Sequence, residues 1–250
     1  MILIYQQELY AQREYLPSES QIFLVEGNLA NTLLALKRYD EALEHHRHVL
    51  IACREMHNEN HPDVIAAESN LANTLAECGR YDESYKYRLD AYQRSSTVFG
   101  ENDMRTIKVE DGLATCLFAM GKKQEALEHT QHVYEHYCRV YGFEHEDTIA
   151  LELSLGNRLS YVGKHEIALK HFLHVWKYYC KNYGISDFKA LMAENNLASA
   201  YYNLHEIKKA LKHQKHVFKE RQLLLGEEHI MTLKAKNILE VYVKYSSEGS

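Results

Sequence analysis

Proline and glycine are scarce in this sequence: its 250 residues include 2 prolines, Pro17 and Pro62, and 11 glycines. A sandwich or barrel built of many short strands needs more turn-forming residues than this, so an all-β fold is disfavoured. The residues used instead, among them leucine, alanine, glutamate and lysine, favour helices. We therefore predict an all-α protein.

Long apolar runs and long basic runs are also lacking. Nowhere do about 18 apolar residues follow one another, as a membrane-spanning helix requires, and no basic segment precedes the short apolar run at 1–4. The formal net charge is -6, and no continuous lysine and arginine stripe is present to neutralise phosphates. We expect a cytoplasmic protein that binds neither nucleic acid nor a membrane.

The five cysteines show no C-x-x-C spacing, and an odd number cannot pair completely within one chain. We expect reduced thiols. Cys138 and Cys180 occupy equivalent positions of the repeat described below, which favours a packing role over a redox role.

Motifs of phosphate binding, zinc-dependent hydrolysis and nucleophilic catalysis are missing too. The chain contains no G-x-x-x-x-G-K-[ST], H-E-x-x-H, G-x-S-x-G or G-x-G-x-x-G. His145, Glu146 and Asp147, which stand together in an expected loop, are interpreted as helix caps. The sequence therefore predicts no enzyme activity and no cofactor.

What the sequence does contain is an internal repeat of 42 residues. Its clearest marker is a leucine, at Leu29, Leu71, Leu113, Leu155, Leu197 and Leu239. A mid-repeat turn recurs at the same interval, at Lys37, Gly79, Gly121, Gly163 and His205. A second stop recurs at Asn58, Gly100, Gly142, Gly184 and Gly226. Because glycine and asparagine adopt the left-handed conformation that ends a helix, each repeat is predicted to contain helix A, a tight turn, helix B and a short loop.

Small and large residues occupy complementary positions of the repeat. Small ones follow the leucine, at Ala30, Ala72, Ala114, Gly156 and Ala198, and large ones lie in helix B, at Leu50, Tyr92, Tyr134, Trp176 and Phe218. A single hairpin cannot bury both of its apolar stripes, so hairpins must stack. We predict one domain over 1–250, a right-handed superhelical solenoid of about twelve helices. Its parts are a lone helix B at 1–15, hairpins at 19–58, 61–100, 103–142, 145–184 and 187–226, a lone helix A at 229–245, and a tail at 246–250.

The repeat resembles that of a known family. The segments NLANTLAECGRYDES (70–84), NNLASAYYN (195–203) and HPDV (61–64) fit the pattern N-L-A-x-x-L-x-x-x-G-[KR]-Y-x-E-A, followed by a helix that ends in G-x-x-H-P. This pattern is similar to the 42-residue tetratricopeptide repeats of kinesin light chain and of the tails of NB-ARC and NLR-type receptors. The resemblance covers almost the whole chain and implies a scaffold that binds a partner protein.

In a stack of this kind the A helices are expected to line a concave groove that receives a protein or peptide ligand. The residues predicted to line it are Asn31, Ser69, Asn73, Glu77, Lys108, Asp111, Thr115, Asn157, Tyr161, Asn195, Tyr202, Lys234 and Asn237. Asn31, Asn73 and Asn157 hold the place at which tetratricopeptide domains resembling those of heat-shock co-chaperones have a peptide-contacting asparagine. An amide can donate and accept at once, as an extended backbone requires. The alternative is that these asparagines bridge adjacent helices.

Histidine pairs with the spacing H-x-x-H recur in helix B. They are His45/His48, His129/His132, His171/His174 and His213/His216, with Tyr87/Asp90 in the second repeat. Residues three apart share a helix face, so a pair could hold a metal ion. No third ligand is apparent at a matching spacing, and adjacent helices stand ~8 to 10 Å apart. We therefore favour rings that pack edge-on against the next repeat and predict no metal site, with a metal-binding module as the alternative.

The two lone helices expected at 1–15 and 229–245 lack a hairpin partner. Met1, Ile2, Leu3 and Ile4 are apolar, whereas a capping repeat normally presents a polar outer face. Two hypotheses follow. The chain is a piece of a longer array, or its terminal helices dock end to end and form a homo-oligomer by head-to-tail contact.

Overall fold

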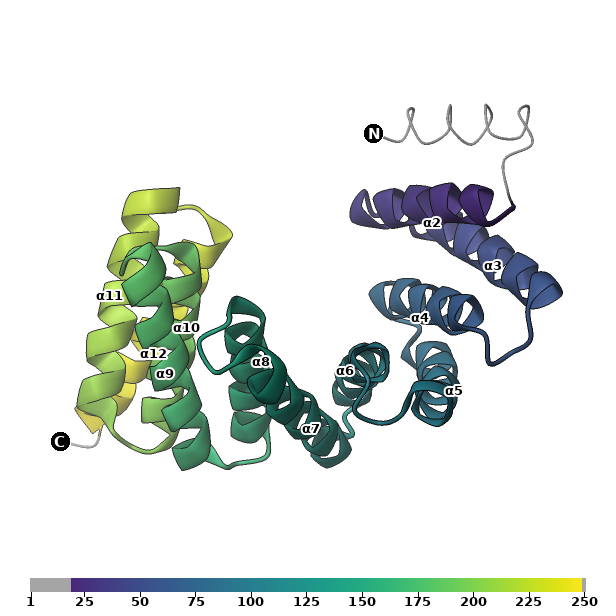
Figure 1. Ribbon diagram of the computed structural model, residues 1–250. Coiled ribbons are helices and arrows are strands. Elements are labelled where there is room, and N and C mark those ends of the chain that lie inside the picture. Colours follow the sequence, from purple (N-terminus) through teal and green to yellow (C-terminus); the bar gives the residue numbers. More distant parts are fainter. Residues whose placement is uncertain (1–18, 249–250) are drawn as a thin grey trace. The chain divides into compact units, whose positions relative to one another are not determined.

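The computed structural model describes residues 19–248, and in that range it contains helices and no strand (Figure 1). The predicted helix at 1–15 lies outside the described residues. The all-α class is confirmed. The helices are α2 (Glu19–Ala35), α3 (Tyr39–Met56), α4 (Pro62–Glu77), α5 (Tyr81–Phe99), α6 (Met104–Ala119), α7 (Lys123–Tyr141), α8 (Glu146–Tyr161), α9 (His165–Tyr183), α10 (Phe188–Asn203), α11 (Ile207–Leu225) and α12 (Ile230–Glu248).

The chain divides into two compact units, Met1–His129 and Thr130–Ser250, and each is described by itself. In the first unit α2 packs on α3, α3 on α4, α4 on α5 and α5 on α6. In the second unit the same holds from α8 to α12. Even-numbered helices correspond to helix A of the repeat and odd-numbered helices to helix B. Helix α12 continues to Glu248, beyond the end expected at 245.

The tight turn inside each repeat requires a residue in the left-handed conformation. Gly79, Gly121 and Gly163 supply it, with φ of 76°, 81° and 81°. Lys37 and His205 occupy the same place with φ of 60° and 59°. A side chain with a Cβ atom costs roughly 1 to 2 kcal/mol in this conformation. Two of the five turns are therefore strained.

The loop before an A helix ends in a capping side chain. Asp103 Oδ1 accepts a hydrogen bond from the backbone N–H of Arg105 at 2.9 Å. His145 Nδ1 accepts one from the backbone N–H of Asp147 at 3.3 Å. Each contact satisfies an N–H of the first helical turn that has no partner within the helix. The predicted capping role of His145 is confirmed.

The connection between α3 and α4 departs from the sequence prediction. The prediction that Asn58 adopts the left-handed conformation is wrong. Among the non-glycine residues of the described range, Lys37 and His205 have positive φ and Asn58 does not. Helix α3 ends at Met56, and the residue that follows, His57, is extended with φ -133° and ψ 158°. The Asn58 side chain instead accepts a hydrogen bond from the backbone N–H of Asn60 at 3.0 Å. This connection reaches α4 by a geometry of its own.

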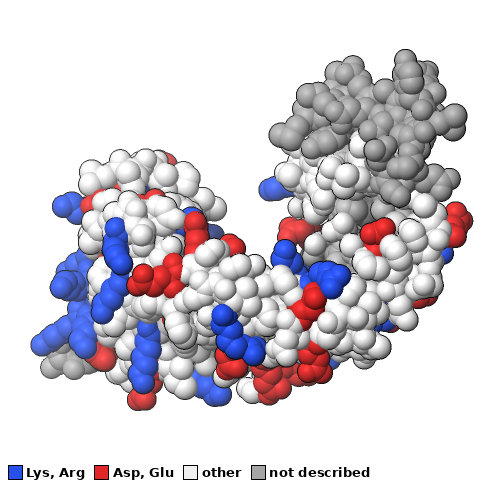
Figure 2. All heavy atoms as spheres, viewed as in Figure 1, with Lys and Arg blue, Asp and Glu red and all other residues white. Residues whose placement is uncertain are grey.

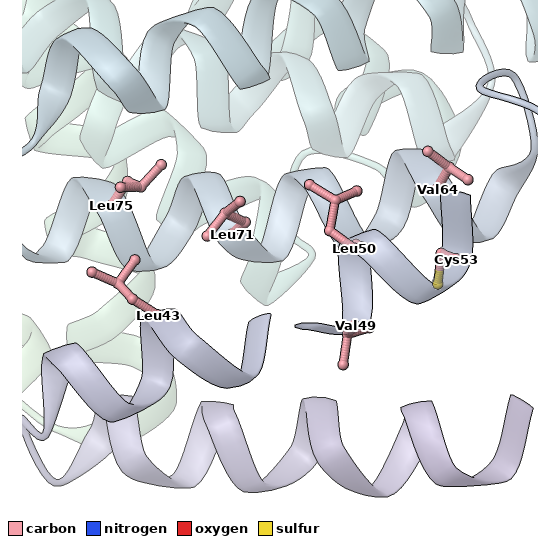
Figure 3. Close-up of a cluster of buried hydrophobic side chains, with 8 residues drawn as sticks. Leu43, Val49, Leu50, Cys53, Val64, Leu71 and Leu75 are labelled. Atoms are coloured by element: carbon pink, nitrogen blue, oxygen red, sulfur yellow. The ribbon is translucent and has the colours of Figure 1, made fainter. Parts of the chain in front are cut away.

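Apolar side chains fill the space between successive helices. Figure 3 shows one such cluster in the first unit, where Leu43 and Leu50 of α3 face Leu71 and Leu75 of α4. All four leucines are at most 3% exposed. Burying one such side chain contributes about 1.5 to 3 kcal/mol. Stability is therefore distributed over the interfaces between neighbouring helices.

One close approach in the second unit depends on a glycine. A Cβ atom added at Gly156 of α8 would lie 2.6 Å from the ring of Phe172 in α9, which is buried. The four other repeats have alanine where Gly156 stands. At the place of Phe172 they have His46, Arg88, Thr130 and Gln214. The largest side chain in this position is therefore matched by the smallest one opposite it.

All five cysteines lie in the described range as free thiols. Burial, with a smaller effect of Glu194, raises the pKa of the Cys180 thiol to about 11. Burial also raises the pKa of the equivalent Cys138. Thiols that stay protonated at neutral pH are poor nucleophiles, which agrees with a packing role. Within residues 19–248 no helix has the length and apolar content needed to cross a membrane.

Candidate functional site

Side chains of three A helices line a hollow of about 650 Å³ in the first unit. Asn31 comes from α2, Asn73 and Glu77 come from α4, and Asp111 and Thr115 come from α6. Asp111 is half-buried and the other four are exposed. Five of the residues predicted to line a groove therefore lie together, on the helices predicted to carry them. We call this the first-unit hollow.

A second hollow, of about 300 Å³, lies between α8 and α10 and is called the second-unit hollow. Its lining residues are Asn157, Ser160, Tyr161, Phe172, Asn196, Ser199 and Asn203. Asn157 and Tyr161 are the predicted groove residues among them. Tyr161 is 62% exposed.

Six predicted residues line neither hollow: Ser69, Lys108, Asn195, Tyr202, Lys234 and Asn237. The Ser69 hydroxyl donates to the Ile65 carbonyl of its own helix at 2.9 Å. Asn195 Oδ1 accepts from Gln214 at 3.4 Å. The Tyr202 ring stacks on Tyr242 with centroids 4.4 Å apart. The three remaining side chains are exposed. Helical spacing thus brought seven of the thirteen predicted residues to the two hollows, and some of the others make contacts within the fold.

Two of the three groove asparagines also hold other side chains in place. Asn157 Oδ1 accepts a hydrogen bond from Asn196 Nδ2 at 2.9 Å, which links α8 to α10. Asn73 Oδ1 accepts one from Arg88 Nη2 at 2.7 Å. The bridging interpretation therefore applies to both. Both residues also line a hollow.

Arg88 of α5 is a lining residue that sequence reasoning missed. It is 7% exposed, it lines the first-unit hollow, and its Nε donates to Ser84 Oγ at 3.1 Å. Burial lowers the pKa of the guanidinium, and the nearby Asp111 carboxylate opposes this shift. The hollow therefore combines one buried positive charge with the carboxylates of Glu77 and Asp111.

One feature of the sequence could have identified Arg88. It is a charged side chain at a helix B position where the other repeats have an uncharged residue or a histidine. Gly112 of α6 matches it, because a Cβ atom at Gly112 would overlap the Arg88 guanidinium. The other repeats have larger residues at the place of Gly112: Asn28, Asn70, Ser154 and Asn196. Arginine and glycine thus form a complementary pair, as phenylalanine and glycine do at Phe172 and Gly156.

Charged side chains on the outer surface are distributed differently from those that line the first-unit hollow. Figure 2 shows both signs spread over the visible face, with basic side chains gathered at its left, where Figure 1 places α9 and α11. The lysines of α11 are Lys208, Lys209, Lys212, Lys215 and Lys219. None of them lines the first-unit or the second-unit hollow. The charge inside the hollows is therefore set by other residues.

The paired histidines bind a buried glutamate of the same hairpin. Glu194 of α10 has a side chain that is 3% exposed. Its Oε1 lies 2.9 Å from His213 Nδ1 and its Oε2 lies 2.6 Å from His216 Nδ1, both on α11. An ionised carboxylate only accepts, so each ring donates its Nδ1–H. We call this arrangement a glutamate clamp.

The clamp recurs along the chain. Its other members are Glu26 with His45 at 3.0 Å and His48 at 2.8 Å, Glu110 with His129 at 2.9 Å, and Glu152 with His171 at 3.0 Å and His174 at 2.6 Å. The second repeat has no histidine pair. There the fully buried Glu68 is bound by Arg54 of α3 at 2.6 Å and by Arg94 of α5.

The glutamates of the clamps were missed although they follow the repeat. They stand three residues before five of the six repeated leucines, at Glu26, Glu68, Glu110, Glu152 and Glu194. The sequence prediction that no third metal ligand recurs at a spacing that matches the histidine pairs is therefore wrong. The carboxylate supplies hydrogen bonds to the two rings, one through each oxygen. The histidine pairs thus join helix A to helix B.

The first ring of a clamp also packs against a neighbouring repeat. Tyr134 of α7 meets His171 edge-on with centroids 5.9 Å apart, and Trp176 of α9 meets His213 at 5.3 Å. Edge-on packing is therefore confirmed, but the neighbour is the preceding repeat and not the next one. The clamps of Glu152 and Glu194 therefore each join three consecutive helices, B, A and B.

One other group of side chains could hold a metal ion. In the described part of the chain, His57, His61 and Asp63 are the one set of three histidine, cysteine or acidic residues whose ligand atoms lie within 4.8 Å of one another. They stand where α3 ends and α4 begins, apart from the clamps.

Comparison with protein-family models gives two matches with one description. A model described as tetratricopeptide repeat matches residues 21–77 and 63–139, and a second model of that description matches residues 191–230. No curated protein matches the chain.

Several solved structures share this fold. The kinesin light chain-like repeats of Podosopora anserina give a TM-score of 0.73 at 18% identity, covering 84% of this chain and 99% of theirs. The protein BtubC of P. vanneervenii gives 0.76 at 16% identity, covering 90% and 91%. YrrB, a tetratricopeptide protein with an unusual peptide-binding site, gives 0.57 at 18% identity, covering 91% and 96%. At identities this low, the structural similarity shows that the proteins share a fold and nothing more.

Proposed function

Because the chain belongs to the tetratricopeptide repeat proteins, we propose that it is a scaffold that binds a segment of a partner protein against its A helices. The observation that carries this proposal is the first-unit hollow, where α2, α4 and α6 bring Asn31, Asn73 and Asp111 together. The same type of helix lines the second-unit hollow. Binding without catalysis is the function that these features support.

The chemistry of the hollows favours an extended polar segment. Asn31 in the first hollow and Asn157 in the second carry amides that can donate to and accept from a peptide backbone. Tyr161 offers an exposed ring for an apolar side chain. Arg88, Glu77 and Asp111 add charges of both signs to the first-unit hollow. A partner segment with alternating polar and apolar residues fits this lining, and charges complementary to those three would set its register.

The proposal is tested with a peptide selected from a random library for binding to the full chain. Asn31→Ala removes an exposed amide from the first-unit hollow, and Tyr161→Ala removes an exposed ring from the second. Losing a hydrogen bond of about 1 kcal/mol weakens binding about fivefold, and losing an aromatic contact of about 2 kcal/mol weakens it about thirtyfold. We expect at least one of the two variants to show its loss by calorimetry.

Matched controls are available on the same chain. Asn182 of α9 is exposed, and its side chain bonds the Tyr178 carbonyl of its own helix at 2.8 Å. Tyr183 is 44% exposed and lines neither hollow. Asn182→Ala and Tyr183→Ala should leave the affinity unchanged. Unchanged affinity in both hollow variants would exclude the hollows as the binding surface.

A second candidate function is self-association through α12. This helix exposes Ile230, Val241 and Val243, which are 62%, 54% and 48% exposed. Large exposed apolar side chains can contribute to a contact surface. Light scattering over a concentration series tests this candidate. Mass should rise with concentration for the wild type and less for Val241→Lys, and one monomer mass at every concentration would exclude it.

A further inference from the structure

We propose that His57, His61 and Asp63 form a binding site for a divalent transition-metal ion such as zinc, at the junction of α3 and α4. His57 directly follows α3, His61 caps α4 and Asp63 lies in the first turn of α4. Imidazole nitrogen and carboxylate oxygen are ligands that zinc prefers. The site is separate from the clamps, and it goes beyond the scaffold function.

The distances among the three ligand atoms resemble those around a bound ion. Asp63 Oδ2 lies 3.7 Å from His57 Nε2 and 3.6 Å from His61 Nδ1. All three side chains place a ligand atom within 4.8 Å of the others. Two ligands of a tetrahedral zinc ion, each about 2.0 to 2.2 Å from the metal, stand about 3.4 Å apart. The observed separations are close to this value and too long for hydrogen bonds.

The glutamate clamps provide a contrast within the same molecule. In the clamp of Glu194 each carboxylate oxygen is taken by one ring at hydrogen-bond distance, and the carboxylate is buried. Asp63 has a side chain that is 58% exposed, and neither imidazole is within hydrogen-bond distance of it. Its oxygens are therefore open to an ion that enters from solvent.

The two imidazole rings lie face to face, with centroids 3.8 Å apart and planes inclined by 6°. A metal ion binds in the plane of each ring, so both rings must tilt for His57 and His61 to share one ion. His61 Nδ1 must also release the backbone N–H of Asp63, which it accepts at the long distance of 3.3 Å. His57 and His61 are partly exposed and Asp63 is exposed, so their side chains are free of the close packing that would prevent such rotations.

The combination of ligands occurs in one repeat only. The residues equivalent to His57 are Phe99, Tyr141, Tyr183 and Leu225. The residues equivalent to Asp63 are Arg105, Asp147, Lys189 and Met231. An aromatic or aliphatic residue that covers the end of helix B elsewhere is thus replaced here by a ligand. The same connection also has its own backbone geometry, described above for Asn58.

The surroundings of the site connect it to the core. It stands between the C-terminal end of α3, where the helix dipole is negative, and the N-terminal end of α4, where it is positive, so the two dipoles oppose each other there. His57 and Asp63 line a cavity of about 330 Å³ together with Cys53. In Figure 3 Cys53 lies at the end of α3 beside Val64 of α4, in the cluster that joins the two helices. An ion bound here would tie the first repeat to the second.

The test is metal binding by the full chain after removal of metal with a chelator. Zinc is titrated in competition with a coloured chelator, and cobalt absorbance reports the coordination geometry. The wild type is expected to bind one equivalent more zinc than His57→Phe, which introduces the residue of position 99. Asp63→Asn should lose the same equivalent. Zinc should raise the melting temperature of the wild type and not that of either variant.

The control is the natural counterpart in the fourth repeat. His145 caps α8 and lies 3.8 Å from Asp147, but Tyr141 stands where a third ligand would be needed. His145→Gln should therefore keep the full zinc stoichiometry. Equal binding by wild type and Asp63→Asn would overturn the site, and so would an equal loss in His145→Gln, which would indicate scattered binding to surface histidines. Asp63→Asn alters one exposed side chain, so it remains informative should His57→Phe unfold.

Discussion

Lowering the pH from 7.5 to 5.5 should destabilise the first unit through one side chain, His46 of α3. This residue is 1% exposed, its Nδ1 lies 2.8 Å from Thr74 Oγ1, and its Nε2 has no hydrogen-bond partner. A second proton on the ring would be buried with nothing to accept it. Burial, with smaller effects of His45, which lowers it, and Glu26, which raises it, brings the pKa of His46 to about 4.

The size of the effect follows from the difference between the folded and unfolded pKa values. An unfolded histidine titrates near ~6.5, so between this pH and 4 the unfolded chain binds a proton that the folded chain does not. The contribution of His46 is thus complete above pH 6.5 and is lost as pH falls toward 4. At pH 5.5 the loss amounts to about 1.4 kcal/mol, and at pH 7.5 it is close to zero.

Urea unfolding of the wild type and of His46→Gln at the two pH values measures this loss. Glutamine stands at the equivalent position 214, so it suits the site, and it does not titrate. Because other groups titrate as well, the quantity compared is the pH dependence of the unfolding free energy in the two proteins. It should be larger by about 1.4 kcal/mol in the wild type. Equal pH dependence, or an NMR titration of His46 with a midpoint near 6.5, would refute the reasoning.

Two further predictions concern the turns and the clamps. Lys37→Gly should raise the unfolding free energy by up to about 1 kcal/mol, and Gly121→Ala should lower it by about 1 to 2 kcal/mol, because both positions have positive φ and a Cβ at Gly121 meets nothing within 4 Å. Urea unfolding measures both changes. A lower unfolding free energy for Lys37→Gly, or a higher one for Gly121→Ala, would contradict the left-handed turn. Glu194→Leu should cost about 3 kcal/mol, since it removes two charge-assisted hydrogen bonds of about 1.5 kcal/mol each. Glu194→Gln should cost much less, because an amide accepts from one ring and donates to the other; equal costs would contradict the clamp.

The fold could be predicted from the sequence because its strongest signals are periodic. The equivalents of Leu71 and Gly79 recur at an interval of 42 residues. A leucine followed by a small residue predicts a closely packed helix, and the turn residue after it predicts where that helix ends. The exception is Asn58, which has the residue type for a left-handed stop but adopts another geometry. A local preference of asparagine is weak, and here its side chain bonds the loop instead.

The candidate site was predicted in part, for a similar reason. Helical spacing identifies a face, so it brought Asn31, Asn73 and Asp111 into one hollow. It does not show that Tyr202 is covered by the ring of another helix, nor that Arg88 reaches the hollow from helix B past a glycine. Both facts depend on contacts between different helices, which the spacing within one helix does not show. The clamp glutamates recur every 42 residues and could have been noticed in the sequence. Their role could not, because it depends on the histidines of the next helix that bind them.

The central claim is that a partner segment lies against the A helices, and the most direct measurement is photo-crosslinking of the selected peptide. A photoreactive phenylalanine replaces Thr115 or Tyr161 in the hollows, or the exposed Thr97 or Tyr183 outside them. We predict a crosslinked product at position 115 or 161 and none at 97 or 183. Crosslinking at 97 or 183 with none at 115 and 161 would contradict the claim.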